Sequence, residues 1–341
     1  MPREAAIRLL SLGSTHWLRT QSVYHALAET MRAGSPDTII LTQPAQAYLC
    51  LGYHQELASV LDRAACEQMG LPITRRRVGG GATYLDANQL FYQCVFHHSR
   101  VPPVVDRAYA RLLAAPIATL RALDLNAELR GENEIEVGCD PIARKSNRGR
   151  PGKRIAGIGG GRMGEAAVVV GNLLFDFDYE AMTRAWRVPS ESFRRLAAGA
   201  LRERVTTLRA ELPHPVSPGE VEARLVAEFA RALGRPLERG ELTEAEKQKA
   251  EELEKRLTSA KWLNLHANGA RPMSSLKISR GVFIRAAEAE VDGHRLRAAF
   301  RVHDEVIEQA VLESEPEHEW EEIERRLPGV KWTAWTQVLQ E

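Results

Sequence analysis

The chain of 341 residues is long enough for about two domains, because single domains commonly hold ~100–200 residues. Its 46 lysines and arginines almost balance its 45 aspartates and glutamates, which argues against a general polyanion-binding protein and against nucleic acid as a partner. No apolar run is long enough to span a bilayer and no long apolar core follows Met1, so we expect a cytoplasmic protein without a membrane partner.

The cysteines are widely scattered along the chain. They are Cys50, Cys66, Cys94 and Cys139. This spacing excludes a Cys-x-x-Cys metal site and the disulfide framework of a short secreted chain, so we expect a reducing compartment.

Secondary structure is predicted from the spacing of apolar side chains and from clusters of β-branched and aromatic residues. The predicted helices are 14–31, 61–70, 109–123, 217–234 and 243–257, with a closing helix that contains Trp320, Ile323 and Leu327. The predicted strands are 38–42, 47–51, 90–96, 134–137, 153–158 and 166–177, with a hairpin over 282–302 that turns at Asp292 and Gly293. We expect Ser14 or Thr15 to cap the first helix and Pro116 to kink the third.

Two helix starts late in the chain carry a capping box. Ser217 and Glu220 form the first, with a proline at the first helical position, and Thr243 and Glu246 form the second. The helix after Thr243 is almost all Glu, Lys, Gln and Ala, so we expect it to be exposed and to bridge two domains. The predicted organisation is a catalytic domain over 1–242, a linker helix over 243–258 and a small accessory domain over 259–341.

Two basic, glycine-rich stretches lie in the first half of the chain. Residues 75–86 hold three arginines and then three glycines, and residues 153–162 begin with Lys-Arg and hold four glycines. Glycine lets backbone N–H groups approach an anion closely, and arginine pairs with phosphate or carboxylate oxygens. Either stretch alone is also typical of an ordinary turn with solvated arginines, whereas the presence of both favours an anion-binding site.

Four stretches resemble motifs of the lipoate–protein ligase family, within the biotin/lipoate ligase superfamily. They are 51–55 (LGYHQ), similar to a Gly-x-x-Gln element; 76–86, similar to the nucleotide- and acyl-binding signature; 152–157 (GKRIAG), similar to a Gly-Lys-Lys-Ile-x-Gly motif; and 204–208 (RVTTL), similar to a stretch near the end of the large domain. The resemblance runs through most of residues 10–235 and more weakly through 258–341. The chain departs from the family pattern at Val78, Leu85 and Val170, where the family usually has polar residues.

The resemblance implies an α+β fold: a class II synthetase-like biotinyl/lipoyl transferase sheet flanked by helices, with a small C-terminal α/β accessory domain. It implies an ATP-dependent lipoate–protein ligase that uses Mg²⁺, makes an acyl-adenylate from lipoic or octanoic acid, and transfers the acyl group to a lysine of a lipoyl-domain protein. The implied acceptor is a glycine cleavage H-like protein or the E2 lipoyl domain of a 2-oxoacid dehydrogenase.

By the same resemblance Lys153 is the catalytic residue, because a compact ammonium can stabilise the charge that develops between the acyl oxygen and the α-phosphate. The resemblance assigns nucleotide and acyl binding to Arg76, Gly79, Gly80, Gly81, Ala82, Tyr84, Asp86, Asn133, Ile155 and Gly157. Asp86 is a candidate both for a Mg²⁺ ligand and for the cap of a turn. The basic loop 144–154 would grip pyrophosphate, steer an acidic acceptor domain, or simply be solvated.

Two other activities are compatible with the sequence. An octanoyltransferase of the same superfamily would take the acyl group from a carrier thioester without ATP. It would need a cysteine nucleophile, for which Cys139 is the candidate near the lysine motif. A non-catalytic binding subunit that kept the fold would bind nucleotide without turnover, and the retention of Arg76 and Lys153 argues against it.

Overall fold

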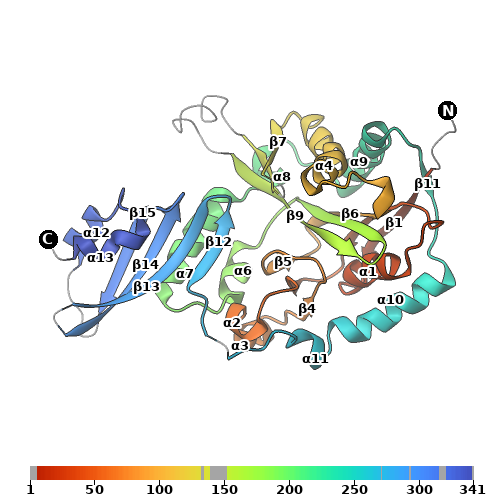
Figure 1. Ribbon diagram of the computed structural model, residues 1–341. Coiled ribbons are helices and arrows are strands. Elements are labelled where there is room, and N and C mark those ends of the chain that lie inside the picture. Colours follow the sequence, from red (N-terminus) through yellow and green to blue (C-terminus); the bar gives the residue numbers. More distant parts are fainter. Residues whose placement is uncertain are drawn as a thin grey trace. The chain divides into compact units, whose positions relative to one another are not determined.

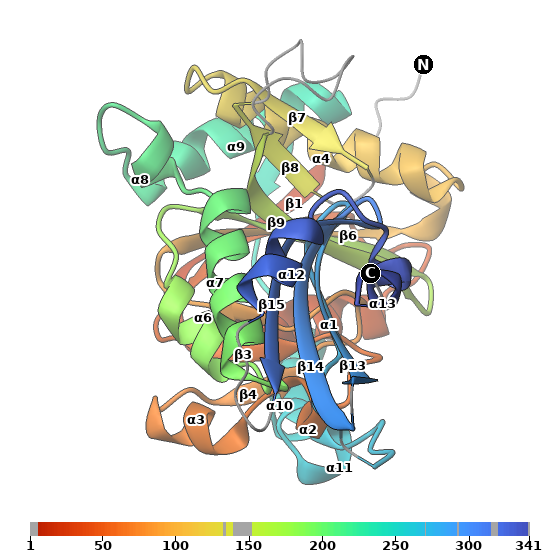
Figure 2. The same cartoon turned by 90° about the vertical axis from the view of Figure 1, so that its left-hand side faces the viewer.

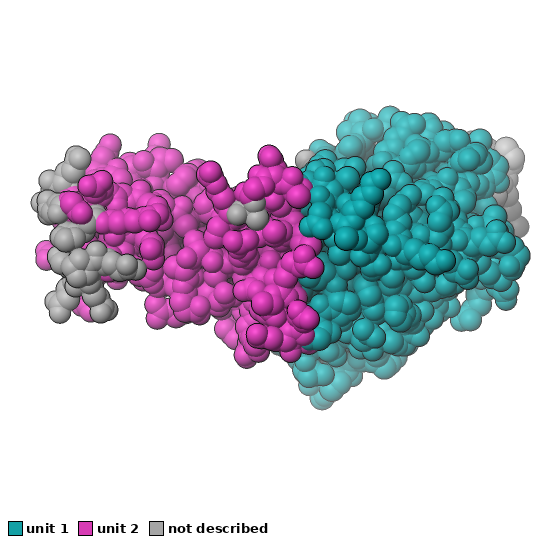
Figure 3. All heavy atoms as spheres, turned by 90° about the horizontal axis from the view of Figure 1, so that it is seen from below, with its two compact units in different colours: residues 1–55, 70–178, 205–266 teal, residues 56–69, 179–204, 267–341 magenta. Residues whose placement is uncertain are grey.

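The computed structural model describes residues 6–131, 134–138, 152–269, 271–291, 293–314 and 320–339. The chain forms two compact units, which Figure 3 shows in two colours. Unit 1 comprises residues 1–55, 70–178 and 205–266, and unit 2 comprises residues 56–69, 179–204 and 267–341. Each unit is therefore assembled from three separate segments of the chain.

Unit 1 is built on an eight-stranded mixed sheet with the strand order β11-β1-β2-β6-β10-β9-β8-β7. These strands are β1 (Ile7–Thr15), β2 (Thr38–Pro44), β6 (Gln89–His97), β7 (Ala127–Arg130), β8 (Glu134–Val137), β9 (Lys153–Met163), β10 (Ala166–Leu174) and β11 (Leu237–Arg239). A small sheet of order β4-β3-β5 lies in the same unit, with β3 (Tyr48–Leu51), β4 (Ile73–Arg75) and β5 (Thr83–Leu85). The mixed α/β class predicted from the sequence is confirmed.

Helices cover both faces of the large sheet (Figure 1). The helices of unit 1 are α1 (Arg19–Thr30), α4 (Val105–Arg121), α8 (Leu208–Glu211), α9 (Pro218–Leu233), α10 (Glu244–Leu257) and α11 (Ala260–Leu263), with the 3-10 turn η1 (His98–Arg100). Successive residues of a strand point to opposite faces. Ile39 and Leu41 accordingly pack in the core beneath α4 and α9, whereas Ile40 packs in the core beneath α1.

The first helix differs from its prediction. Residues 7–15 form β1, which the sequence did not suggest, and α1 begins at Arg19 without a side-chain cap. Ser14 and Thr15 therefore belong to a strand, paired with β2, and do not cap a helix. Helix α4 continues through Pro116, and both capping boxes, at Ser217 and Thr243, are confirmed.

Helix α10 also differs from its prediction, because it packs into unit 1. Ala250, Leu253 and Leu257 are fully buried in a cluster with Trp17 and Leu18. Three apolar residues on one stripe are enough to dock a helix that is otherwise charged. The bounds of the two units consequently differ from the predicted 1–242, 243–258 and 259–341.

Ionic and polar contacts fix this C-terminal part of unit 1. Glu29 of α1 pairs with Lys249 (3.3 Å) and Arg256 of α10, and also with Arg77 (2.6 Å) of the first glycine-rich stretch. Arg75 is fully buried, and its guanidinium donates to five carbonyl oxygens, those of Gly52 (3.2 Å), Tyr53 (2.8 Å), Gln55 (2.5 Å), Trp262 (3.0 Å) and Leu263 (2.6 Å).

Unit 2 holds an antiparallel sheet of order β12-β13-β14-β15. Its elements are α2 (Leu57–Val60), α3 (Arg63–Gln68), α6 (Tyr179–Ala185), α7 (Glu191–Arg204), β12 (Ser275–Ser279), β13 (Val282–Val291), β14 (His294–His303), β15 (Val306–Ser314), α12 (Glu321–Arg326), η2 (Trp332–Ala334) and α13 (Trp335–Val338). Phe300 of β14 packs against Trp335, whereas Arg301 pairs with Glu203 of α7, so the sheet is covered on both faces (Figure 2). The predicted hairpin over 282–302 is confirmed, and Asp292 of its turn lies outside the described residues.

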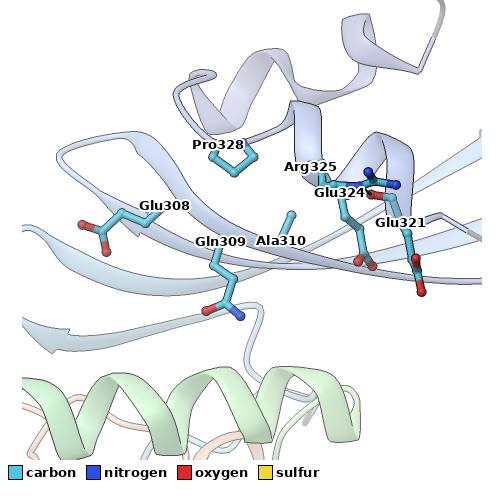
Figure 4. Close-up of a pocket in the computed structure, with 7 residues that line it drawn as sticks. All are labelled: Glu308, Gln309, Ala310, Glu321, Glu324, Arg325 and Pro328. Carbon is cyan, nitrogen blue, oxygen red and sulfur yellow. Dashed lines mark hydrogen bonds between the residues drawn. The ribbon is translucent and has the colours of Figure 1, made fainter.

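A polar hollow of about 470 Å³ lies between β15 and α12 of unit 2 (Figure 4). Its lining residues are Glu308, Gln309, Ala310, Glu321, Glu324, Arg325 and Pro328. No residue predicted to bind substrate lies among them. Across the described part of the chain, every helix is too short or too polar to cross a membrane.

Candidate active site

The first glycine-rich stretch forms a loop between β4 and β5 that Arg76 holds from inside. Arg76 is 8% exposed, and its Nε and Nη2 both donate to the carbonyl oxygen of Gly79, at 3.2 and 2.8 Å. Nη2 also donates to the carbonyl of Gly81 (2.8 Å), and Nη1 to that of Cys50 (3.0 Å). In this structure the guanidinium therefore shapes the loop.

The Gly-x-x-Gln element docks against this loop. A Cβ on Gly52 would lie 1.9 Å from the carbonyl oxygen of Gly80, so only glycine fits there. Gly80 itself has φ +97°, a left-handed conformation that favours glycine. The Tyr53 N–H donates to the carbonyl of Val78 (3.1 Å), and the Gln55 side chain accepts from the Gly52 N–H (3.0 Å). Two of the four motif stretches thus form one structure.

The second glycine-rich stretch, in β9, meets the first. A Cβ on Gly159 would lie 3.4 Å from Val78 Cγ2 and 3.6 Å from the Gly79 carbonyl oxygen. Gly79 and Gly81 have nothing within 4 Å of the position that a Cβ would take, so their outer sides are open. The loop and β9 together form a wall that is rich in glycine, and a glycine-rich backbone of this kind can approach a phosphate closely.

A chain of amide hydrogen bonds connects β9 to the loop across the sheet. The Gly157 N–H donates to Asn172 Oδ1 of β10 (3.0 Å), and Asn172 Nδ2 donates to Gln89 Oε1 of β6 (2.6 Å). Gln89 Nε2 donates to the carbonyl of Tyr84 in β5 (3.1 Å). The sequence predictions missed Asn172 and Gln89. The available signal was the presence of amide side chains in two largely apolar strands.

Asp86 lies next to this series of amide hydrogen bonds and caps a turn. It is 8% exposed; Oδ1 accepts from the N–H of Asn88 (2.9 Å) and Oδ2 from Asn88 Nδ2 (3.2 Å). Burial raises the pKa of its carboxyl, and these hydrogen bonds oppose that effect. Within the described residues, no group of three or more His, Cys, Asp or Glu is arranged to hold a metal ion. The structure therefore shows the turn-capping role, whereas the Mg²⁺ role of Asp86 stays a prediction.

Three of the remaining predicted residues lie near the loop or in the core. Tyr84 is 7% exposed and its ring meets that of Phe177 edge-on, at 6.0 Å between centroids. Burial raises the pKa of its hydroxyl well above the usual value. Ile155 is fully buried in the main core cluster, and Ala82 is half-buried beside the loop glycines.

The lysine motif occupies the start of β9. Lys153 is half-buried and pairs in register with Val137 of β8, and Arg154 pairs with Glu136. The Arg154 guanidinium lies 4.0 Å from the carboxylate of Glu134. The Arg154 carbonyl accepts the N–H of Thr206 at 2.9 Å, so the fourth motif stretch also reaches this strand.

Two predictions fall outside the described residues: those on Asn133 and Cys139. The same holds for residues 144–151 of the basic loop. The described cysteines, Cys50, Cys66 and Cys94, are buried, and burial raises the pKa of each thiol, that of Cys66 to about 11. A thiolate nucleophile needs a lowered pKa, so none of these three suits that role.

The sequence pattern of the lipoyl protein ligase A/B catalytic domain matches residues 18–230, more than half of the chain. The chain belongs to the lipoyl protein ligase A/B family. Lipoate-protein ligase A subunit 1 of Thermoplasma acidophilum is 27% identical over 213 residues, 62% of this chain and 79% of that protein. The octanoyltransferase LipM of Kyrpidia tusciae is 29% identical over 243 residues, 68% and 88% of the two chains. That of Moorella thermoacetica is 25% identical over 271 residues, 77% and 99%.

Solved structures show the same fold as this member of the lipoyl protein ligase A/B family. A bipartite lipoate protein ligase of Thermoplasma acidophilum, studied with its E2 lipoyl domain, has a TM-score of 0.68 at 24% identity, over 79% of this chain and 100% of that one. A lipoate-protein ligase A bound with ATP has a TM-score of 0.60 at 22% identity, over 76% and 98%. The resemblance predicted from the four motifs is confirmed, and the family includes both of the enzyme classes that the sequence suggested.

Proposed function

We propose that this lipoyl protein ligase A/B family member is an ATP-dependent lipoate–protein ligase. In the first step, an oxygen of the lipoate or octanoate carboxylate forms a bond to the α-phosphorus of ATP. The bond from that phosphorus to the β-phosphate oxygen breaks, and pyrophosphate leaves with the electron pair. In the second step, a neutral lysine amine of the acceptor attacks the acyl carbon, AMP leaves, and the amine gives up its proton.

The observation that supports this proposal is the wall formed by the loop at Gly79–Gly81 and by β9. The loop is held in shape by Arg76, its two outer glycines are open, and β9 begins with Lys153 and Arg154. Preorganised N–H groups and cations stabilise a polyphosphate that gains charge in the transition state, and they need no rearrangement to do so. The thioester route requires a thiolate, and the cysteines of the described residues are all buried.

ATP, lipoate and a lipoyl-domain acceptor are the proposed substrates. Related structures contain ATP or lipoic acid, or come from a system with an E2 lipoyl domain, which supports these choices for this chain. The described residues offer no cluster of metal ligands. We therefore propose that Mg²⁺ enters on the phosphates and neutralises part of their charge.

The second candidate is an octanoyltransferase, favoured by the similarity to the LipM relatives. It would need the Cys139 thiol to take the octanoyl group from a carrier thioester and to pass it to the acceptor lysine, without ATP.

One experiment separates the two activities. The ligase should exchange labelled pyrophosphate into ATP when lipoate or octanoate is present, and Cys139→Ala should not change that rate. Octanoyl transfer from a carrier thioester without ATP, abolished by Cys139→Ala, would refute the ligase proposal. Nucleotide binding without either reaction would indicate a binding subunit.

A further inference from the structure

The strands β7, β8 and β9 have one apolar face and one polar face. Two residues that pair across the β7–β8 ladder lie on the same face of the sheet, and successive pairs alternate between the two faces. The apolar pairs are Ala127 with Val137 and Leu129 with Ile135, and all four side chains belong to the main core or pack against it. The polar pairs are Glu128 with Glu136 and Arg130 with Glu134. This polar face provides a reference for the two cations that start β9.

A β-bulge at Ile155 decides which face each cation takes. In a regular strand, Lys153, Ile155 and Gly157 would share one face, since side chains alternate with a period of two. Here Ala156 pairs with Ile135 and Arg154 with Glu136, so one extra residue is inserted in β9. The alternation therefore shifts by one residue between Gly157 and the start of the strand.

As a result, Lys153 points to the core face of the sheet and Arg154 points to the polar face. Lys153 pairs with Val137, which is 1% exposed and belongs to the core face. Arg154 pairs with Glu136 of the polar face. A second observation agrees, because the Arg154 guanidinium lies 4.0 Å from the carboxylate of Glu134, which is also on the polar face.

The polar face continues into the candidate site. Glu134 pairs in register with Gly157, and Gly159, two residues further along β9 and so on the same face, has its Cβ position 3.4 Å from Val78 Cγ2 of the loop. Arg154 therefore lies on the same face as these groups, and Lys153 does not. At 4.0 Å the pair with Glu134 is longer than a hydrogen bond of ~2.7–3.2 Å, so this contact orients the guanidinium without using its N–H donors.

We propose that Arg154, in place of Lys153, is the cation that contacts the anionic oxygens of the acyl carboxylate and the α-phosphate. This inference rests on the proposed ligase function and names the residue that serves it. Arg154 forms no covalent bond in the reaction. Its planar guanidinium presents several donors at once, which suits two oxygens of a carboxylate or a phosphate, and its charge persists at any physiological pH.

The adjacent positions provide a matched pair of variants. Arg154→Met and Lys153→Met each remove one positive charge, one residue apart, and both leave an unbranched apolar side chain. We expect Arg154→Met to lower kcat/KM for lipoate-dependent pyrophosphate exchange by ~10²–10³-fold, as for loss of one preorganised donor. We expect Lys153→Met to lose at least about tenfold less activity than Arg154→Met, because its side chain lies on the other face of the sheet. Arg154→Lys keeps the charge but loses the planar guanidinium with its several donors. It should retain at least about tenfold more activity than Arg154→Met.

Thermal melting of each variant distinguishes a loss of substrate contact from a loss of folded protein. A merely structural Arg154 would lower the melting temperature and leave kcat/KM unchanged once the folded fraction is taken into account. That result would overturn the inference. A large loss of kcat/KM in Lys153→Met with Arg154→Met near wild type would also overturn it. So would equal losses of kcat/KM in both variants, which would show that only the net charge of this strand matters.

Failure of the ligase proposal gives a different result. In that case the wild type itself shows no pyrophosphate exchange, and the same two variants are compared in octanoyl transfer from a carrier thioester. A larger loss in Arg154→Met would still support contact with the acyl carbonyl oxygen. If the wild type transfers no acyl group, ATP affinity is compared, and equal affinities of the two variants would reject the inference.

Discussion

At the scale of single residues, the loop at Gly79–Gly81 depends on two kinds of fit. Arg76 supplies donors to three carbonyl oxygens, and Gly52 leaves room for the Gly80 carbonyl. We expect Gly52→Ala to cost ~1–3 kcal/mol of stability, because its Cβ would overlap backbone and force the loop outward. Gly81→Ala is the matched control, since its Cβ would meet nothing within 4 Å and its melting temperature should equal that of the wild type. Equal melting of the two variants would contradict this account of the loop.

A buried histidine makes the same region sensitive to acid. His25 is fully buried, pairs through Nδ1 with the Gln21 carbonyl (2.6 Å) and accepts the N–H of Arg77 at Nε2 (3.0 Å). Burial lowers the pKa of His25 to about 3, against about 6.5 in an unfolded chain. The folded state thus binds fewer protons, and the stability that His25 contributes is complete above about pH 6.5 and is lost towards pH 3.

The variant His25→Gln tests this pH dependence. It should be less stable than the wild type at pH 7.5, and the gap between the two should narrow as the pH falls from 6.5 to 5. Urea unfolding at several pH values measures this gap. Parallel curves for the two proteins would show that His25 does not titrate on unfolding.

At the scale of elements, α10 shows how a charged helix can still be structural. Leu253 is fully buried against α1 and its neighbours, whereas Glu251 on the same helix is exposed. We expect Leu253→Ala to cost ~2–5 kcal/mol by leaving a cavity, and Glu251→Ala to change stability by no more than about 0.5 kcal/mol. Denaturant unfolding of both variants measures these costs. Similar, small effects would support the exposed linker that composition alone predicts.

Elements with strong local signals were predictable, and the face on which a site residue lies was not. The capping boxes at Ser217 and Thr243 identified two helices because the caps are local chemistry. Strand β1 was missed because Ser14 and Thr15 were predicted to cap a helix, whereas pairing with β2 stabilises them as strand. Lys153 was chosen from the resemblance of residues 152–157 to a lysine motif, and a motif does not show which face of the sheet each of two adjacent cations takes; the bulge at Ile155 decides that. A bulge depends on the partner strand, so it leaves no trace in the spacing of one strand alone.

At the scale of the whole molecule, the chain passes between the two units several times. A fragment that ends at residue 242 would lack α10 and α11, and with them the buried Leu253 and two of the five carbonyl partners of Arg75. We expect fragment 1–242 to show no cooperative melting by near-UV circular dichroism. Fragment 1–266 keeps all three segments of unit 1 and should melt cooperatively. Cooperative melting of both fragments would show that α10 is dispensable for unit 1.

The buried guanidinium of Arg75 also bears on the order in which the protein is made. It joins carbonyl oxygens at Gly52, Tyr53 and Gln55 to others at Trp262 and Leu263. Synthesis proceeds from the N-terminus, so the early part of unit 1 leaves the ribosome long before residues 262–263 exist. During that interval a charge destined for the interior lacks two of its partners. The Gly-x-x-Gln turn and the loop docked on it can therefore reach their final form only after about three quarters of the chain has been translated. The wall formed by this loop and β9 is then one of the last features of the protein to be completed.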